Sequence, residues 1–332
     1  MVATLIVIGA VVVILSLLNL KTSRPDGTYL RKIPPFRKLL IHTLPVRDNS
    51  TVLYDDFAYA DELDRYISKI NERFHVDYTH CVVAAIANGM KKAPLMNQFV
   101  VGRRLYRRKG IWITFSMKKQ KLNKKAYLSA VKREVPEDQS FYELVTGLNE
   151  SIKVERSGEK TYQDKELDLL SKIPRPVLKF GVKLLMWLDY YGLLPGSFIK
   201  SDAMYTSIFA ANLGSVGMQA GYHHLYDWGT CPLFVMIGAV EERPMVDNGQ
   251  VVVRRVIPLR FTFEERIADG LNAGFGIKAV VDALEHPFEL LGCVAADGSD
   301  DHPIGEPPAS KGGIPAGCVG AEDDARKKAT VH

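Results

Sequence analysis

The stretch Phe261-Thr-Phe-Glu-Glu-Arg-Ile-Ala-Asp-Gly-Leu271 decides the fold, because it joins the end of an apolar strand to the start of a helix. The strand is predicted over 251–263 and the helix over 272–284, and His286-Pro287 ends the helix. Charged side chains stand beside the turn between these two elements. This is the place in the chain where chemistry can be argued from residue types and their spacing.

The same stretch resembles the signature of the catalytic domain of the 2-oxoacid dehydrogenase acyltransferases (dihydrolipoamide acyltransferases), in which a strand ends in Ser-Phe-Asp-His-Arg-Val-x-Asp-Gly. The residues that match are Phe263, Arg266, Asp269 and Gly270. Glu265 stands where that family keeps its catalytic histidine. Residues 207–217 resemble the family's Phe-Thr-Ile-Ser-Asn-Leu-Gly strand and glycine turn, and residues 232–244 resemble its next strand.

The resemblance extends over about residues 36–292 and implies an α/β fold with a mixed sheet flanked by helices, like that of chloramphenicol acetyltransferase. It also implies a homotrimer whose active sites lie between subunits, with a coenzyme A thioester as co-substrate and no covalently bound cofactor. No Asp-Lys-Ala lipoylation site is present in the sequence. The sequence therefore gives little support for partners in a dehydrogenase complex.

The resemblance also implies the roles of the site residues. In the family, the histidine takes the proton from a thiol so that the sulfur can attack a thioester carbonyl, and the aspartate four residues later orients its neighbours. Glu265 and Asp269 occupy these two positions, and Arg266 between them is expected to support a substrate or oxyanion. Proton transfer from a thiol costs ~2.7 kcal/mol to a histidine and ~5.7 kcal/mol to a glutamate with ordinary pKa values. A carboxylate base therefore needs burial, and because neighbours on a strand point to opposite faces, at most one of Glu264 and Glu265 looks into the site.

Other candidates stand in the half of the chain that carries the motif. The hydroxyl that supports the oxyanion in the family falls on Ala211, which leaves Asn212 and, as a stand-in hydroxyl, Ser215. The loop over 222–229 contains the pair His223 and His224, either of which is an alternative base. The spacing of these histidines to Asp227 is one residue too short for a His-His-x-x-x-Asp-Gly motif. The alternative for this loop is packing at the trimer contact, and Cys231 is a weaker candidate nucleophile.

Two function classes remain open. The first is a membrane-tethered acyltransferase that moves an acyl group from a thioester such as acyl-CoA to an unknown acceptor. The second is a catalytically silent trimer of the same fold that binds acyl-CoA or partner proteins. The combined loss of the histidine and the hydroxyl favours the second class, whereas the remaining motif and the histidine pair favour the first.

The chain divides into four predicted parts. Residues 1–20 contain an apolar run from Val2 to Leu20 that is long enough to cross a bilayer, with a buried core helix as the alternative. Basic residues follow this run, which predicts a single-pass anchor that holds the downstream domain in the cytoplasm. A linker is expected over 21–35, the acyltransferase-like domain over 36–292, and a disordered tail over 293–332.

Composition excludes several other classes. The 332 residues carry a formal net charge of +5, and the basic residues form no single stripe, so a nucleic-acid partner is not expected. Four widely spaced cysteines encode neither a disulfide framework nor a zinc site, which indicates a reducing compartment.

Periodicity predicts three helices that bear on the later argument. The segment 79–92 is expected to form a central buried helix, and 124–135 is expected to form another helix. The segment 174–194 is predicted to form an apolar helix that lies in the core, with a membrane interface as its alternative.

Overall fold

The centre of the molecule is a mixed β-sheet. The structure, a computed structural model, describes residues 1–118, 128–156 and 172–306. Within these residues a seven-stranded sheet has the order β2-β10-β8-β7-β5-β6, and β9 pairs with β10. Its strands are β2 (Thr51–Tyr59), β5 (Ile111–Lys118), β6 (Leu128–Val135), β7 (Ile208–Asn212), β8 (Leu233–Ile237), β9 (Glu241–Asp247) and β10 (Gln250–Glu264). β7 is parallel to β5 and to β8, and the other pairs are antiparallel.

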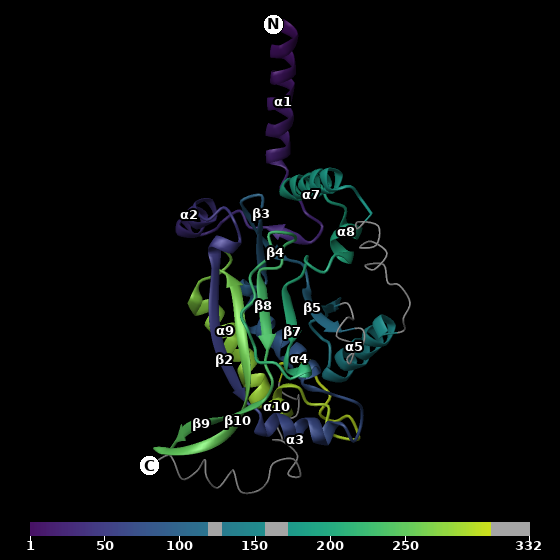
Figure 1. Ribbon diagram of the computed structural model, residues 1–332, viewed down its shortest axis with the longest axis vertical. Coiled ribbons are helices and arrows are strands. Elements are labelled where there is room, and N and C mark those ends of the chain that lie inside the picture. The colour runs from purple at the N-terminus through teal and green to yellow at the C-terminus, as the bar shows by residue number, and fades with distance from the viewer. Residues whose placement is uncertain (119–127, 157–171, 307–332) are drawn as a thin grey trace.

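Helices cover one face of this sheet (Figure 1). They are α3 (Asp61–Ile70), α4 (Tyr78–Lys92), α5 (Phe141–Arg156), α9 (Gly270–Glu285) and α10 (Pro287–Leu290). The expected α/β fold with a mixed sheet flanked by helices is therefore confirmed. The strand and the helix predicted on either side of the opening stretch are β10 and α9.

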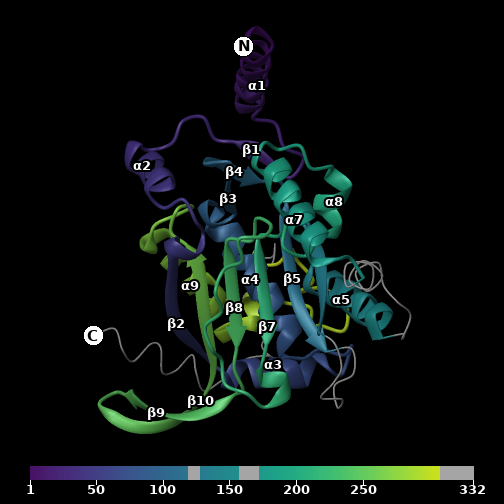
Figure 2. The ribbon, with the colours of Figure 1, turned by 45° about the horizontal axis from the view of Figure 1, so that its top comes forward.

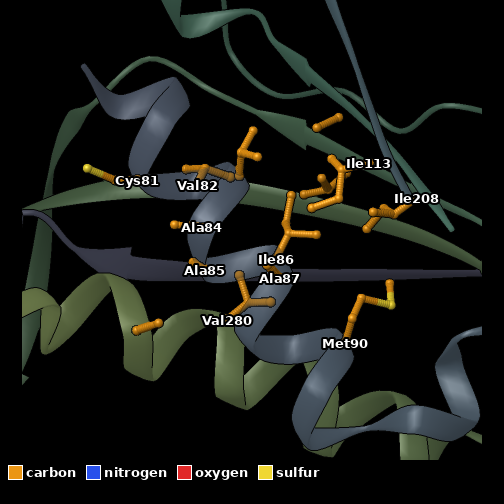
Figure 3. Packing of buried hydrophobic residues seen from close by; sticks show 14 of the residues in the cluster. Cys81, Val82, Ala84, Ala85, Ile86, Ala87, Met90, Ile113, Ile208 and Val280 are labelled. Atoms are coloured by element: carbon orange, nitrogen blue, oxygen red, sulfur yellow. The ribbon is translucent and has the colours of Figure 1, made fainter. Parts of the chain in front are cut away.

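Helix α4 lies in the centre of the core, as its unbroken apolar and small residues predict. Every residue from His80 to Met90 is buried. Figure 3 shows its side chains packed between the sheet and α9, with Ile86 and Met90 facing Ile113 and Ile208 of the sheet. The two helices approach closely at Gly89, where an added Cβ would lie 2.6 Å from Val280 Cγ2 and 2.8 Å from the Gly276 carbonyl oxygen.

The elements near the base of the N-terminal helix lie at one end of the large sheet (Figure 2). A three-stranded sheet has the order β1-β4-β3. Its strands are β1 (Gly27–Tyr29), β3 (Gln98–Val101) and β4 (Arg104–Arg108), and the helices beside it are α2 (Pro35–Thr43), α7 (Arg175–Tyr190) and α8 (Gly196–Ser201). Helix α1 (Val2–Leu20) projects away from this end, and none of its residues is buried. The short 3-10 helices are η1 (Asp48–Ser50), η2 (Pro94–Met96) and η3 (Gly214–Val216).

The prediction of a linker over 21–35 is wrong. Residues 27–29 pair with β4, and Arg24 is 5% exposed. Its guanidinium group forms ion pairs of 2.9 Å with Asp26 and 2.8 Å with Asp189. The proline and glycine content predicts a linker, but pairing with β4 and a buried ion pair over a long sequence separation fix residues 24–29 to the domain.

The predicted tail also begins too early. Cys293 and Ile304 are fully buried, and the Ile304 amide donates a hydrogen bond of 3.1 Å to the Gln139 carbonyl oxygen. The Tyr66 hydroxyl donates to the carbonyl oxygen of Gly292 at 2.8 Å. Residues 293–306 therefore belong to the folded domain, although they show no apolar periodicity, and the rest of the predicted tail lies outside the described residues.

Two helix predictions in the middle of the chain need correction. Residues 128–135 form strand β6, because pairing with β5 overrides their local preference, and 124–127 lie outside the described residues. The segment 174–194 does form a helix, α7, but a core position is wrong for most of it. Phe180 is 68% exposed and Trp187 is 42% exposed.

Candidate functional site

The end of β10 sets Glu264 and Glu265 in opposite environments. Glu264 is fully buried, whereas Glu265 is exposed. The alternation follows from the pleat of the strand, which continues to Glu264, and the Glu264 amide donates to the Pro232 carbonyl oxygen at 3.0 Å. Of the two acids, Glu265 alone is accessible to a substrate at this end of the sheet.

Two arginines neutralise the buried carboxylate. Arg47 Nε donates to Glu264 Oε2 at 2.9 Å, and Arg266 Nε donates to Glu264 Oε1 at 2.7 Å. Arg266 also donates to the carbonyl oxygens of Leu44 and Pro45 at 2.9 and 3.2 Å. The matched arginine of the motif, predicted to support a substrate or oxyanion, thus holds the chain before β2 against the end of β10. The sequence analysis missed Arg47, which stands outside every motif quoted above.

Glu265 is held by its backbone. Its amide donates to the Ser50 carbonyl oxygen at 2.8 Å, and its own carbonyl oxygen accepts from Arg37 Nη1 at 2.7 Å. These bonds fix the turn and leave the carboxylate at the surface. The burial that a carboxylate base needs is not supplied by the described part of a single subunit.

Asp269 caps helix α9. Its Oδ1 accepts hydrogen bonds from the backbone amide of Asn272 at 2.9 Å and from the side-chain amide at 2.8 Å. These bonds lower the pKa of Asp269 below its usual value, and Arg37, 3.7 Å away, acts in the same direction. A carboxylate kept ionised at a helix N-terminus orients the turn. The orienting role that the resemblance implies for Asp269 within the active site stays a prediction.

The histidine loop reaches the same end of the sheet. Arg47, which binds Glu264, also donates to the carbonyl oxygens of Tyr226 and of Gly229. The ring of His223 is stacked on Phe234, with the ring centroids 4.6 Å apart, and on His224 at 4.8 Å. His223 Nδ1 lies 2.7 Å from the His224 carbonyl oxygen, so that nitrogen carries a proton. In this tautomer Nε2 is the ring nitrogen that can accept a proton.

Asn212 and Ser215 lie at the opposite end of the sheet. Asn212 pairs with Ile237 at the end of β8, and Ile237 pairs with Leu259 of β10. Glu264 follows Leu259 by five residues, which is about 17 Å along the strand. Asn212 Oδ1 accepts from the Ser215 amide at 3.0 Å, and the Ser215 hydroxyl donates to the Asn212 carbonyl oxygen at 2.8 Å. Asn212 and Ser215 are therefore not brought together with Glu265 within one subunit.

A cavity of about 330 Å³ opens beside the motif. Its wall includes Arg47, Arg266, Tyr205 and Trp228, and the end of α7 closes one side with Met186 and Tyr190. Mixed polar and aromatic walls of this kind suit an amphipathic ligand. Within residues 1–118, 128–156 and 172–306, no group of three or more His, Cys, Asp or Glu side chains is arranged to hold a metal ion.

Residues 197–292 match the family model of the 2-oxoacid dehydrogenases acyltransferase catalytic domain, which places the motif, the histidine loop and strands β7 to β10 in one family segment. The resemblance to that family is thereby confirmed. A lipoamide acyltransferase component of the branched-chain alpha-keto acid dehydrogenase complex from Pseudomonas aeruginosa is 43% identical over 57 residues, which is 17% of this chain and 13% of that protein. A dihydrolipoyllysine-residue succinyltransferase component of the 2-oxoglutarate dehydrogenase complex from Cupriavidus necator is 42% identical over 55 residues, also 17% and 13%.

The matched segment thus spans about an eighth of the length of these acyltransferase components. The fold is shared more widely. The cubic core of a pyruvate dehydrogenase multienzyme complex has a TM-score of 0.51 at 16% identity, and the alignment covers 78% of this chain and 93% of that one. A dihydrolipoamide acetyltransferase from Azotobacter vinelandii gives the same values, in a study of the roles of a serine, a histidine and an asparagine in its catalytic mechanism. The acyltransferase-like architecture therefore extends well beyond the matched segment.

Proposed function

We propose that this chain is an acyltransferase that works as a homotrimer, with each active site built between two subunits. The donor is an acyl thioester such as acyl-CoA, and the acceptor is a small nucleophile. The family segment over 197–292 supports the reaction class, and the shared fold supports the assembly. Within that fold, the hydrogen bonds of Arg266 and Asp269 keep the motif turn in place.

The separation of Glu265 from Ser215 carries this proposal. The two lie at opposite ends of the sheet, so one subunit cannot bring Glu265 and Ser215 to the same carbonyl carbon. A second copy that places its Asn212-Ser215 end against the Glu265 end of the first would complete the site. Such a contact would also bury Glu265, as a carboxylate base requires.

His223 is the alternative base. Its Nε2 is unprotonated in the neutral ring, and an imidazole is better matched to a thiol proton than a carboxylate is. Arg47 joins its loop to the end of β10 that carries the motif. His224 lies beside it and is exposed.

The anchor belongs to the same proposal. Helix α1 has a mean hydropathy of 2.7, none of it is buried in the domain, and it is the candidate span among the described residues. Basic residues after it, including Lys21 and Arg31, would keep the domain on the cytoplasmic side. The enzyme would thus act at the inner surface of a membrane.

The test is acyl transfer by the full chain from acetyl-CoA and longer acyl-CoAs to small thiols, amines and alcohols. A Glu265 base predicts that Glu265→Gln removes activity, because the amide keeps the shape of the side chain and loses its basicity. A histidine base instead makes His223→Ala or His224→Ala costly and Glu265→Gln nearly silent. Activity that survives all three substitutions would exclude these residues as the base.

A silent trimer is the second candidate, and one observation favours it. By the resemblance in sequence, Ala211 and Glu265 stand where the family has its serine and histidine, so the hydroxyl would be lost and the imidazole exchanged for a carboxylate. In that case the parent chain binds acyl-CoA and assembles as a trimer, but no substrate on the panel turns over above the uncatalysed rate.

A further inference from the structure

Helix α7 has two apolar stripes, and the domain covers one of them. Its inner stripe packs on the small core of Leu194, Ile199 and Tyr205 through Leu185 and Leu188. A second stripe is exposed, and we call it the outer stripe. Its members, with their exposed fractions, are Val177 at 59%, Phe180 at 68%, Leu184 at 43% and Trp187 at 42%. The two stripes are offset by about 100° around the helix, so the contact that buries the first cannot bury the second.

Helix α2 adds exposed apolar residues at the same end of the molecule. Phe36 is 71% exposed and Leu39 is 60% exposed, while Ile41 is buried and fixes the opposite side of the helix to the domain. Exposed apolar side chains that gather on one surface of a folded domain mark a contact with a protein or a membrane.

The turn between β3 and β4 fixes both helices to the base of α1. Arg103 Nη1 donates to the His42 carbonyl oxygen at the end of α2, at 3.3 Å, and Arg104 donates to the Asn19 carbonyl oxygen near the end of α1. Gly102, in the left-handed region with φ +57°, lies against the Tyr190 carbonyl oxygen at the end of α7. Figures 1 and 2 both show α2 and α7 at the end from which α1 leaves, and in Figure 1 both lie across its direction. Helices α2 and α7 therefore lie at one end of the domain, beside the base of α1.

The charges on this surface identify the partner. Lys179 and Lys183 form a third stripe on α7, and both are exposed. Lys38 of α2 is exposed, whereas the single acid of α7, Asp189, is buried against Arg24. Lysines that flank an exposed apolar stripe suit the head-group region of a bilayer that contains anionic lipids, where their amino groups remain in water.

We propose that the outer stripe of α7, together with Phe36 and Leu39 of α2, lies in the head-group region of an anionic bilayer and holds the domain against the membrane. This contact rests on the proposed α1 anchor, because the anchor places the surface at the bilayer. It also sets the 330 Å³ cavity, which Met186 and Tyr190 of α7 help to line, at the membrane side of the domain.

The test places a fluorophore on the outer stripe of the full chain. Phe180→Cys is labelled with an environment-sensitive dye in a chain that also carries Cys318→Ser, since Cys81, Cys231 and Cys293 are buried. Val251→Cys, at a position 73% exposed in the β9-β10 hairpin, is the matched control. The chains are reconstituted into vesicles of phosphatidylcholine with about a third phosphatidylglycerol, with and without lipid carrying a nitroxide near the head group.

A lipid contact predicts about twofold quenching at position 180 and none at 251. Lys179→Glu combined with Lys183→Glu weakens the quenching, whereas the same charge change at Lys153 and Lys278 leaves it unchanged. Equal quenching at 180 and 251 would overturn the proposal. A dye at 180 that is shielded from aqueous iodide but not quenched by the nitroxide lipid would assign the surface to a second copy or another protein instead.

Flotation of the same vesicles in alkaline carbonate reports on α1 separately. Chains that float without quenching at position 180 keep the anchor and overturn the surface contact. Quenching at neutral pH in chains that carbonate extracts supports the contact and overturns the anchor. Acyl transfer is measured in a separate assay, so failure of the proposed activity is distinguished from failure of the anchor or of the surface contact.

Discussion

The adjacent carboxylates Glu264 and Glu265 at the end of β10 lie in different environments, because neighbouring residues on a strand point in opposite directions. Glu264 binds two guanidinium groups in a site from which water is excluded, whereas Glu265 stands at the surface of the same turn. The alternation along a strand predicts that the two acids differ. The alternation does not predict which of the two acids is buried. That depends on Arg47, the buried ion-pair partner of Glu264, which lies 217 positions away in the sequence.

Glu264→Gln is therefore expected to destabilise the domain by about 3 kcal/mol, because it leaves Arg47 and Arg266 without their buried counter-charge. Glu265→Gln, one residue later and exposed, is the control and is expected to change the free energy of unfolding by less than about 0.5 kcal/mol. Denaturant unfolding of the two variants beside the parent chain measures both values. Equal stability of the two variants would contradict the structural role of Glu264.

Cys231 is expected to be chemically silent in the folded chain. Burial raises the pKa of its thiol from 9.0 to about 11, and Sγ donates to the Leu233 carbonyl oxygen at 3.1 Å. Because the thiolate is the reactive form, alkylation at pH 8 is expected to be about 100-fold slower than for a free thiol. Folded and denatured chains are treated with iodoacetamide, and mass spectrometry of the peptide that contains Cys231 measures the ratio of the two alkylation rates. A ratio near one would restore Cys231 as a candidate nucleophile.

At the scale of elements, the contact between α4 and α9 depends on glycine. Gly89→Ala places a methyl group 2.6 Å from Val280 Cγ2 and 2.8 Å from a backbone oxygen, so the helices must separate. A loss of about 1–3 kcal/mol is expected. Gly274→Ala in α9, where nothing lies within 4 Å of the new methyl group, is the control and should stabilise the helix by about 0.5–1 kcal/mol. Thermal unfolding that ranks the two variants in the reverse order would contradict the packing in Figure 3.

The contribution of residues 293–306 to stability can be tested by truncation. A chain that ends at Gly292 loses the burial of Cys293, Val294 and Ile304, worth about 4 kcal/mol together, which corresponds to a fall in Tm of about 10 °C. A chain that ends at Glu306 retains these three residues and serves as the control. Identical melting curves for the two chains would mean that the segment contributes nothing to the fold.

The elements that the sequence predicted well are those whose own residues carry the signal. The strand and helix around the motif and the small-residue helix α4 are of this kind. Strand β1, strand β6 and residues 293–306 were missed because contacts distant in sequence determine them, such as the ion pair of Arg24 with Asp189 and the pairing of β6 with β5. The exposure of α7 could not be predicted either, since its second apolar stripe is typical of a core helix.

At the scale of the whole molecule, the site residues are predictable from the motifs, but their grouping is not. The sequence motifs predict that the glycine turn after β7 and the turn after β10 contribute to one site. Strand direction places them at opposite ends of the sheet, because β10 is antiparallel to β8 and β8 is parallel to β7. The proposed closed trimer would resolve the separation, since each subunit would then offer one half of a site to each of two neighbours.

Mixed trimers test this arrangement directly. If both residues are essential, chains with Glu265→Gln and chains with Ser215→Ala are each inactive alone, because every site lacks one component. Coexpression of the two in equal amounts produces random trimers in which about a quarter of the sites combine an intact Glu265 with an intact Ser215 from the neighbouring subunit. Acyl transfer is then expected to recover to about a quarter of the parent rate, with the double variant coexpressed with either single variant as the control. If the active site lay within one subunit, no site in any mixed trimer would hold both residues, and no activity would return. A Ser215→Ala chain that is fully active by itself would instead remove Ser215 from the site and leave the opposite half to Asn212.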